Sequence, residues 1–341
     1  TETFPFIAVA ASARGTITRI ETRTGQVIGE YRSAPEGRPT NPSRTTVDLF
    51  GNVWTGNRDE AGSNSGSVVK IGLIVGGIRA NSDGTPNITG EYLKAPFSYN
   101  TCSDRNNDGL IRTSRGLGDI RRWINVTDGA GGTTGLVEDA DDECILLYQR
   151  LPNSPAVRHV TVDRDNHLWV AGYPFSPQIF YKLDGQTGAF LDSFNARTLG
   201  CGGYGGLIDR NGVLWSASYS QHRLMRYDTV TREGRCINIP SSYGLGVGPD
   251  GFIWNSASGS NSIYKISPDG TLVSGFPKSV NGSGPTGMAV NPRDGHVWTA
   301  NRFGGNVSRL DTEGNLVKSI ATGATPTGVA IDSAGKVWVT N

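Results

Sequence analysis

The amino-acid sequence predicts an all-β protein, because its composition and its patterning both favour many short strands joined by tight turns. The 341 residues include 47 glycines and 17 prolines, whereas charged residues make up 18% and hydrophobic residues 36% of the chain. This composition is unlike that of a coiled coil, a collagen or a charge-rich disordered chain. Apolar and polar residues alternate in short stretches bounded by turn residues, which is typical of half-buried antiparallel strands.

A tryptophan-containing segment recurs along the chain. Each copy holds a short apolar strand, a turn rich in Asp, Asn and Gly, and a strand with a tryptophan, as in Thr286–Asn301 and Thr327–Asn341. The tryptophans at the equivalent position are Trp54, Trp169, Trp215, Trp254, Trp298 and Trp338. From Trp169 onward they stand about 40–45 residues apart, which is the length of a four-stranded propeller blade.

A second hairpin follows the tryptophan strand, so each repeat has four strands. Ser262–Val273 and Asn306–Val317 alternate apolar and polar residues around a turn. A single four-stranded sheet cannot bury both of its faces, and such sheets stack around an axis to do so. The sequence therefore predicts a β-propeller of four-stranded antiparallel blades with the tryptophans between neighbouring blades. The number of repeats favours six blades and leaves seven open.

The two ends of the chain carry parts of a blade. Phe6–Ser12, Thr16–Glu21 and Val27–Tyr31 match strands two, three and four, whereas residues 327–341 match strands one and two. We therefore expect one domain, residues 1–341, whose ring is closed by N- and C-terminal strands. Because strand two is supplied twice, either the natural chain continues past Asn341 or one copy can join another sheet.

The repeat is interrupted between Trp54 and Trp169. Gly72–Asn100 resembles an outer hairpin, residues 101–144 form a turn-rich irregular insertion, and Cys144–Arg150 resembles an outermost strand. A long irregular insertion in a compact domain usually has a function of its own or is held in place by additional bonds. We therefore expect a site in the insertion.

Asp104–Leu110 has the spacing of a calcium-binding loop. Such loops place side-chain oxygens at positions one, three and five, glycine at six and a backbone carbonyl at seven. The corresponding ligands are Asp104, Asn106, Asp108 and Leu110. Position twelve is Arg115 instead of glutamate, so another acid such as Asp119 or Glu143 has to complete the shell of a structural Ca²⁺. The alternative is a polar turn that binds no metal.

The four cysteines are predicted to form disulfides. None lies in a Cys-x-x-Cys pair or at zinc-ligand spacing. We favour the pairs Cys102–Cys144 and Cys201–Cys236, but three connectivities are possible and buried free thiols are the alternative.

Several observations bear on the location of the protein. The chain starts at Thr1 instead of Met, which fits a mature secreted or cell-surface product. No apolar stretch is long enough to span a membrane. The formal net charge of +1 gives no overall field that would attract nucleic acid.

A second candidate site lies at the predicted ends of several strands. Cationic and aromatic residues at these junctions would face one mouth of the central channel, where they could hold an anionic or sugar ligand: Arg44, Arg58, Arg158, His159, Tyr204, His222, Tyr243 and Arg302. No Ser or Cys nucleophile adjoins His159 or His222 in the sequence. The alternative is that these residues are solvated strand ends.

The blade pattern resembles the streptogramin lyase (virginiamycin B lyase) group and the NHL-repeat propellers. The resemblance rests on Gly-x-Ala-Val-Asp, a turn, Val-Trp and a later Ile-x-Arg-Leu-Asp, and it covers the chain apart from residues 101–143. It implies a propeller scaffold. In the lyase the tryptophan strands typically read Leu-Trp-Phe-Thr-Glu, and His and Glu at the channel mouth serve metal binding and catalysis. No Glu follows a repeat tryptophan here, so no catalytic residue is carried over.

We therefore expect a secreted, non-enzymatic β-propeller that serves as a structural or binding module. Its partners would be other copies of the chain or another extracellular protein or glycan, and the duplicated strand would allow fibres to form by strand addition. Two alternatives remain open. One is a metal-dependent lyase or lactonase-type enzyme with its site at the channel mouth, and the other is a carbohydrate or protein receptor.

Overall fold

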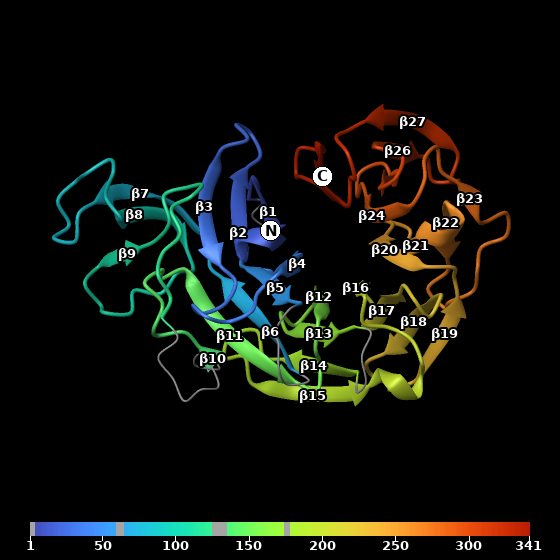
Figure 1. Cartoon of the computed structure of the whole chain (residues 1–341), viewed down its shortest axis with the longest axis horizontal. Helices are drawn as coiled ribbons and strands as arrows, with labels where there is room; N and C mark the ends of the chain where they lie inside the picture. Colours follow the sequence, from blue (N-terminus) through green and yellow to red (C-terminus); the bar gives the residue numbers. More distant parts are fainter. Residues whose placement is uncertain (1–3, 59–64, 125–134, 174–177) are drawn as a thin grey trace. The chain divides into compact units, whose positions relative to one another are not determined.

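The computed structural model describes residues 4–58, 65–124, 135–173 and 178–341. These residues form β-strands and short 3-10 turns, which confirms the prediction of an all-β chain (Figure 1). The chain divides into two compact units, Phe4–Phe194 and Asn195–Asn341, and each is described by itself. No helix among the described residues is long and apolar enough to cross a membrane.

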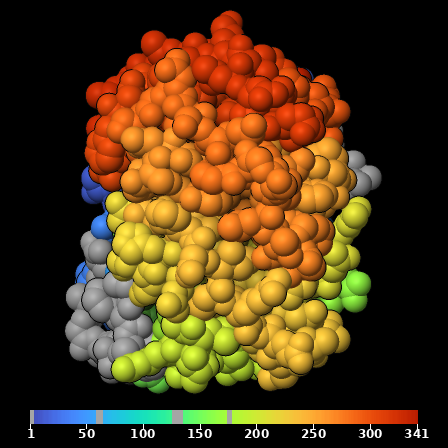
Figure 2. Space-filling model, turned by 90° about the vertical axis from the view of Figure 1, so that its right-hand side faces the viewer, coloured from blue at the N-terminus to red at the C-terminus, as the bar shows by residue number. Residues whose placement is uncertain are grey.

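The unit Asn195–Asn341 shows the predicted four-stranded repeat. Three antiparallel sheets have their strands in chain order and follow one another from yellow to red in Figure 2. They are β16 (Gly205–Ile208), β17 (Val213–Ser218), β18 (Arg223–Asp228) and β19 (Gly234–Asn238); β20 (Ser242–Val247), β21 (Ile253–Ala257), β22 (Ser262–Ile266) and β23 (Lys278–Ser279); and β24 (Pro285–Val290), β25 (Val297–Asn301), β26 (Asn306–Leu310) and β27 (Leu316–Ala321). A two-stranded sheet, β28 (Gly328–Ile331) and β29 (Val337–Thr340), comes last.

The unit Phe4–Phe194 contains one regular four-stranded sheet and three sheets that depart from the repeat. The regular sheet is β12 (Val157–Val162), β13 (Leu168–Gly172), β14 (Ile179–Leu183) and β15 (Phe190–Asn195). A five-stranded sheet has the order β10 (Gly135–Leu136), β11 (Ile145–Pro152), β6 (Ser65–Ile71), β5 (Val53–Asn57) and β4 (Pro42–Val47). The N-terminal sheet is β1 (Phe6–Ala11), β2 (Thr16–Glu21) and β3 (Val27–Arg32).

The region between Trp54 and Trp169 adds a separate sheet. The predicted hairpin within Gly72–Asn100 forms β7 (Ile74–Ala80) and β8 (Tyr92–Asn100), and β9 (Leu110–Arg112) of the insertion pairs with β8. β11 pairs with β6 as the fourth strand of its sheet, as predicted from Cys144–Arg150, and β10 extends the sheet beyond it. Residues 125–134 of the insertion lie outside the described residues.

The repeat tryptophans lie between neighbouring sheets, as expected. Trp54 packs with Val157 and Leu168 of the β12–β15 sheet. Trp215 and Trp254 are likewise enclosed by apolar residues of the sheet that follows each of them. All three indoles are buried, because each is covered by its own sheet and by the next. Trp298 and Trp338, by contrast, are only half-buried.

Five of the repeat tryptophans have a cation over the indole ring. Lys265 on β22 is the register partner of Trp254 on β21, and its ammonium nitrogen lies 5.1 Å from the ring centroid. The same partnership joins Trp54 with Lys70, Trp169 with Lys182, Trp215 with Arg226 and Trp298 with Arg309. A cation in this position is attracted by the negative face of the aromatic ring.

Several of these cations also bind the neighbouring sheet, at the turn that follows its third strand. Lys265 Nζ donates to the carbonyl oxygen of Thr312 at 3.0 Å, and Arg226 Nε donates to that of Pro268 at 3.0 Å. Lys70 Nζ donates to the carbonyl of Gly185 at 2.6 Å. We call this arrangement of tryptophan, cation and neighbouring carbonyl the inter-sheet staple. It joins two sheets by packing, by charge and by a hydrogen bond at the same place.

Replacing a stapled tryptophan should destabilise the protein strongly. Trp254→Ala is expected to lower the free energy of unfolding by about 3–5 kcal/mol, because it leaves a cavity between two sheets. Trp338→Ala is the control and should cost clearly less, because its indole is only half-buried. Urea unfolding of both variants measures the difference. Equal losses would contradict the placement of Trp254 between sheets.

Candidate functional site

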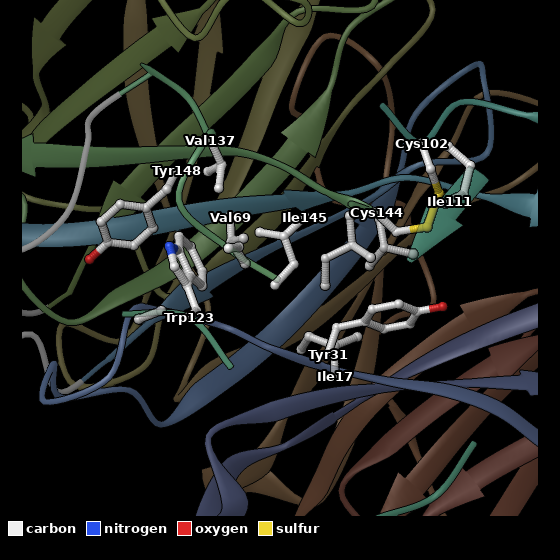
Figure 3. Close-up of a cluster of buried hydrophobic side chains, with 14 of the residues drawn as sticks. Ile17, Tyr31, Val69, Cys102, Ile111, Trp123, Val137, Cys144, Ile145 and Tyr148 are labelled. Atoms are coloured by element: carbon white, nitrogen blue, oxygen red, sulfur yellow. A yellow bond between two sulfur atoms is a disulfide. The ribbon is translucent and has the colours of Figure 1, made fainter. Parts of the chain in front are cut away.

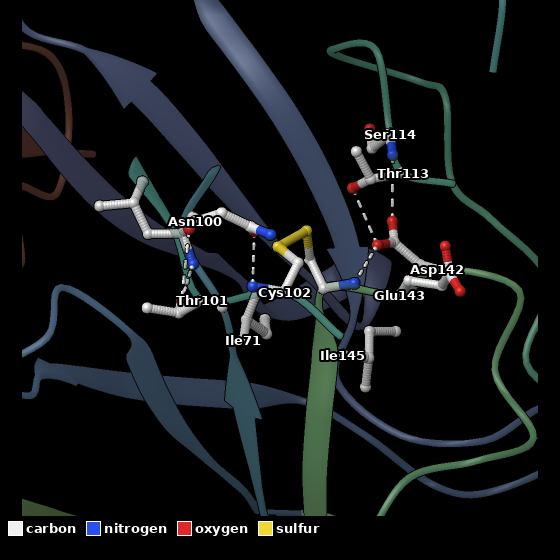
Figure 4. Close-up of a disulfide and its surroundings, with 12 residues drawn as sticks. Ile71, Asn100, Thr101, Cys102, Thr113, Ser114, Asp142, Glu143 and Ile145 are labelled. Carbon is white, nitrogen blue, oxygen red and sulfur yellow. Dashed lines mark hydrogen bonds between the residues drawn. A yellow bond between two sulfur atoms is a disulfide. The ribbon is translucent and has the colours of Figure 1, made fainter. Parts of the chain in front are cut away.

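The insertion is tied to the sheets by a disulfide. Cys102 and Cys144 are bonded with their Cα atoms 4.3 Å apart, and Cys201 and Cys236 with theirs 6.2 Å apart, so both predicted pairs are confirmed (Figure 4). The first bond joins the residues that flank the insertion, Cys102 after β8 and Cys144 before β11. The insertion therefore starts and ends at one fixed point.

A buried carboxylate organises the chain beside this disulfide. Asp142 accepts hydrogen bonds from Thr113 Oγ1 at 2.9 Å, the Cys144 amide at 3.0 Å and the Ser114 amide at 3.1 Å (Figure 4). Burial raises the pKa of Asp142, although these donors act in the opposite direction. The carboxylate thus fixes two segments of the insertion to each other.

Apolar side chains of the insertion join a core shared with the surrounding sheets. Trp123 lies edge-on to Tyr148 of β11, with ring centroids 5.4 Å apart (Figure 3). The same buried cluster includes Ile17 of β2, Val69 of β6 and Ile111 of β9. The described part of the insertion is therefore packed into the unit.

The side chains of the Asp104–Leu110 loop form hydrogen bonds within the loop. The two carboxylate oxygens of Asp104 accept from the amides of Asp108 at 3.1 Å and Gly109 at 2.8 Å, and Asp108 Oδ1 accepts from the Leu110 amide at 2.8 Å. Asn106 Nδ2 donates to Asp108 Oδ2 at 2.9 Å. The side chains expected to bind calcium at positions one, three and five therefore belong to one compact turn.

Asp119 and Glu143, the acids expected to complete the shell, have hydrogen-bond partners of their own. Among the described residues, no three His, Cys, Asp or Glu side chains come together as a set of metal ligands. Asp119 is paired with Arg115 at 2.9 Å and with Arg121 at 2.5 Å. Glu143 accepts from the backbone amides of Arg105 at 2.9 Å and Arg112 at 2.6 Å. Glu143 is thus joined to the Asp104–Leu110 loop through Arg105, whereas Asp119 pairs with two arginine side chains.

The strand-end residues of the unit Phe4–Phe194 have different surroundings. His159 in β12 is fully buried, and its ring lies 5.1 Å from that of Phe180. Its side chain is therefore not exposed, contrary to the expectation from the sequence. Arg58 donates from Nε to the Asn41 carbonyl at 3.2 Å. Arg44 in β4 and Arg158 in β12 are half-buried. Of these four residues, His159 alone is fully buried.

In the unit Asn195–Asn341 the structure brings three tyrosines together. Tyr204 and Tyr243, both predicted, have ring centroids 4.9 Å apart, and Tyr219 lies 5.5 Å from Tyr204 and 5.9 Å from Tyr243. We call these three rings the tyrosine cluster. Tyr219 is 39% exposed, Tyr243 is half-buried and Tyr204 is nearly covered. The cluster thus presents an aromatic surface where β16 and β20 begin and β17 ends.

The loop that carries Tyr204 is held rigidly. The Gly203 amide donates to Ser216 Oγ at 2.8 Å, and the Gly202 amide donates to Ser218 Oγ. Both glycines have positive φ angles, 105° for Gly202 and 92° for Gly203, which a side chain would disfavour. The Cys201–Cys236 disulfide ties the same loop to β19. The position of the Tyr204 ring is therefore set before any ligand arrives.

The other predicted residues of this unit are exposed. His222 accepts a hydrogen bond from the Ser241 amide at 3.0 Å through Nδ1. The guanidinium of Arg302 lies 5.7 Å from the ring of Phe303, which is 71% exposed. Phe303 does not belong to the three rings of the tyrosine cluster, so it serves as an independent exposed aromatic residue.

Short polar side chains at the ends of the tryptophan strands hold the backbone. Ser218 Oγ accepts from the Gly202 amide, and Asn57 Nδ2 donates to the Ser33 carbonyl at 2.8 Å. Asn301 Nδ2 donates to Ser308 Oγ at 2.9 Å, and Asn57 Nδ2 donates to Ser67 Oγ at 3.0 Å. These side chains are buried. At Asn57, Ser218 and Asn301, where the lyase resemblance would place a glutamate, the side chains therefore form hydrogen bonds within the protein.

Comparison with protein families identifies the relatives of this chain. The profile of the virginiamycin B lyase family matches residues 145–341, which is more than half of the sequence. The chain belongs to the virginiamycin B lyase family. This confirms the resemblance seen in the tryptophan repeat. No curated protein matches the chain.

Solved structures support the fold. A streptogramin B lyase has 14% identity and a TM-score of 0.61, over 98% of this chain and 86% of that chain. A catalytically inactive virginiamycin B lyase from Staphylococcus aureus with quinupristin has 13% identity and a TM-score of 0.60, over 99% and 92%. Hydrazine synthase from Kuenenia stuttgartiensis has 13% identity and a TM-score of 0.60, over 99% and 94%. At these identities the likeness extends to the fold alone.

Tyr219 was missed by the sequence analysis, although a signal for it exists. It lies four positions after Trp215, the same place that Arg58 holds after Trp54 and Arg302 after Trp298. Those two arginines were chosen as site residues, and the equivalent position in each repeat would have included Tyr219. The repeat register, more than the residue type, locates this surface.

The Asp119 ion pairs should make the insertion sensitive to acid. Partial burial acts to raise the pKa of Asp119, but hydrogen bonds from Arg115 and the charge of Arg121 lower it from 3.8 to about 2. Because the folded pKa is depressed, the stabilisation is present above pH 4 and is lost as the pH falls toward 2.

Asp119→Asn should therefore be less stable than the parent at pH 7, by less than about 1 kcal/mol since the pair is partly exposed to water. Thermal unfolding measured between pH 7 and pH 2 should show this difference shrinking below pH 4. A difference that stays constant over that range would show that the ion pairs contribute nothing.

Proposed function

We propose that the protein is a non-enzymatic, extracellular β-propeller that serves as a structural and binding module. The observation that carries this proposal is that Asn57, Ser218 and Asn301 form internal hydrogen bonds at positions where the lyase resemblance would place a glutamate. His159, one of the two histidines considered for the channel mouth, is enclosed in the core. The two disulfides support an extracellular location, because such bonds persist in oxidising compartments.

The rival function is a metal-dependent lyase, which membership of the virginiamycin B lyase family favours. The purified protein is incubated with quinupristin in Mg²⁺, Mn²⁺ or EDTA, and ring opening is followed by chromatography and mass spectrometry. We expect no product in any of the three. Metal-dependent product formation by the parent chain would overturn the proposal.

The tyrosine cluster is the proposed ligand surface, and its proposed ligand is a glycan. Tyrosine combines a large apolar face with a polar hydroxyl and loses little conformational freedom on binding. A sugar ring has an apolar C–H face that packs on an aromatic ring and hydroxyl groups that can bond to the phenol. The pinned Tyr204 and the exposed Tyr219 together supply such a platform.

Removing the exposed ring should abolish glycan binding without unfolding the protein. Tyr219→Ala is expected to lose the signals that the parent gives on a neutral oligosaccharide array. Phe303→Ala, which removes an exposed aromatic residue outside the cluster, should keep them. Thermal unfolding of both variants checks that the fold is retained. Loss of binding in both variants, or in neither, would remove the cluster as the ligand surface.

A structural calcium ion in the Asp104–Leu110 loop is a further part of the proposal. Its ligands would be Asp104, Asn106, Asp108 and the Leu110 carbonyl, with Asp119 or Glu143 to complete the shell. The proposal is supported by the spacing of oxygen ligands and by the compact turn that Asp104 and Asp108 form. An ion here would stiffen an insertion that has little core of its own.

Calcium should raise the melting temperature of the parent relative to EDTA. Asp108→Asn is expected to lose this shift, because it removes one charge from the site. Asp83→Asn, in another exposed turn of the same region, should keep it. Thermal unfolding with CaCl₂, MgCl₂ or EDTA provides the measurement. An unchanged melting temperature of the parent in CaCl₂ would exclude the site.

The proposed architecture is a ring of six blades, one of which combines strands from the two ends of a chain. It is supported by the match of β1, β2 and β3 to strands two, three and four and of β28 and β29 to strands one and two. These five strands are one more than a four-stranded blade needs, because β1 and β29 both match strand two. We therefore also propose that copies assemble into fibres by strand addition. Electron microscopy of the intact chain showing only single particles would exclude fibres.

A further inference from the structure

Three buried polar side chains gather beside Trp54 in the five-stranded sheet. Asp48 lies in the turn after β4, Asn52 directly precedes β5, and Lys70 belongs to β6. Their exposed fractions are 5%, 2% and 6%, and the ammonium nitrogen of Lys70 lies 5.4 Å from the Trp54 ring centroid. Burial removes the hydration of such groups, so each needs a specific partner. We call these three residues the lysine–amide cluster.

The carboxylate of Asp48 links the other two members of the cluster. Its Oδ2 atom accepts from Asn52 Nδ2 at 2.8 Å and lies 3.3 Å from Lys70 Nζ. Its Oδ1 atom accepts from the backbone amides of Phe50 and Asn52, both at 2.9 Å, which fixes the orientation of the carboxylate. The two side-chain nitrogens therefore share one oxygen atom, through which a proton can pass between them.

Strand geometry places Lys70 and Asn52 on the same face of the sheet. Trp54 and Lys70 are register partners in the β5–β6 pair, and Asn52 stands two positions before Trp54. Because side chains alternate between the two faces of a strand, Asn52 shares the face of Trp54 and lies diagonally from Lys70. Diagonal neighbours are within reach of a long side chain such as lysine. The amine and the carboxamide can therefore meet.

The carboxamide oxygen of Asn52 also has a hydrogen-bond donor. Thr101 Oγ1 donates to Asn52 Oδ1 at 2.5 Å and accepts from the Leu73 amide at 2.7 Å. A donor at this place polarises the carbonyl group and stabilises the negative charge that develops on its oxygen during nucleophilic attack. The surroundings of the cluster thus supply a nucleophile, a polarised carboxamide and a proton carrier.

We propose that Lys70 and Asn52 form an intramolecular isopeptide bond with the assistance of Asp48. The Lys70 ammonium gives one proton to Asp48, and the neutral amine then attacks Asn52 Cγ. Asp48 passes this proton to Nδ2 and takes the second proton from the attacking nitrogen. The Nζ–Cγ bond forms, the Cγ–Nδ2 bond breaks and ammonia leaves. No atom changes its oxidation state, so the step needs no cofactor, and the structure shows the side chains before it.

The product keeps the contact with the neighbouring sheet. Lys70 Nζ donates to the Gly185 carbonyl at 2.6 Å. A secondary amide retains one N–H group, so this hydrogen bond persists after the reaction, whereas the positive charge over Trp54 is lost. The new bond closes the β5–β6 hairpin covalently at the joint between two sheets. It is independent of the proposed glycan, calcium and fibre functions.

Another repeat provides an internal comparison. Lys265 also stands opposite its repeat tryptophan and lies 3.3 Å from Asp250 Oδ2. The residue two positions before that tryptophan is Phe252, which has no carboxamide. Lysine and aspartate therefore form only an ion pair there. Asn52 is the residue that turns the same arrangement into a candidate site of covalent modification.

Mass spectrometry of the parent chain tests the bond. The intact protein should be lighter than its sequence mass by one ammonia, once the hydrogens lost to the two disulfides are subtracted. A tryptic digest should contain the peptide with Asn52 joined to the peptide with Lys70, without cleavage after Lys70. A parent that has lost no ammonia would overturn the proposal. So would ammonia loss without the joined peptide, since an asparagine that cyclises before glycine also releases ammonia.

Variants then assign the roles of the two charged residues. Lys70→Arg should retain the full mass, because a guanidinium does not attack the carboxamide. Asp48→Asn should lose the joined peptide, whereas Asp250→Asn, which changes the equivalent carboxylate beside Lys265, should keep it at the level of the parent. Thermal unfolding checks that each variant is folded. An undiminished joined peptide in Asp48→Asn would overturn the assistance by Asp48.

Discussion

The inter-sheet staple is the interaction on which the rest of the structure depends. A stack of four-stranded sheets has one apolar layer at every joint, and this layer must fix both the distance and the rotation between the sheets. The buried indole supplies the packing area, and the paired Lys or Arg supplies a hydrogen bond to the next sheet. Because the cation is buried beside the indole, it also needs a counter-charge, which Asp48 gives to Lys70 at 3.3 Å and Asp250 gives to Lys265 at 3.3 Å.

From the sequence alone, the repeat, its four strands and the place of the tryptophans could be predicted, because each follows from local periodicity. Both disulfides could be anticipated for a similar reason, since the cysteines flank single segments. The partnership of Trp254 with Lys265 could not, because it depends on strand register. The same limit explains the burial of His159 against Phe180, which lies on a different strand of its sheet. The partners of Asp119, by contrast, are Arg115 and Arg121, which are close to it in sequence.

The candidate surfaces share a physical design, in which an exposed group stands on a rigid support. Tyr219 is accessible, but the Tyr204 ring beside it is fixed by a disulfide and by two glycine amides. The Asp104–Leu110 loop is exposed, but the segment behind it is tied by the buried Asp142 and by Trp123. Groups held in this way need little further ordering to bind a ligand.

The claim that tryptophan, cation and neighbouring sheet act as one unit is tested most directly by a double-mutant cycle. Unfolding free energies are measured in urea for the parent, Lys265→Met, Trp254→Leu and the double variant. The staple predicts a coupling energy between the two sites of about 0.5–2 kcal/mol, since the cation loses its ring and its orientation toward Thr312 together. Strictly additive losses would contradict it, because the indole and the cation would then stabilise the joint independently.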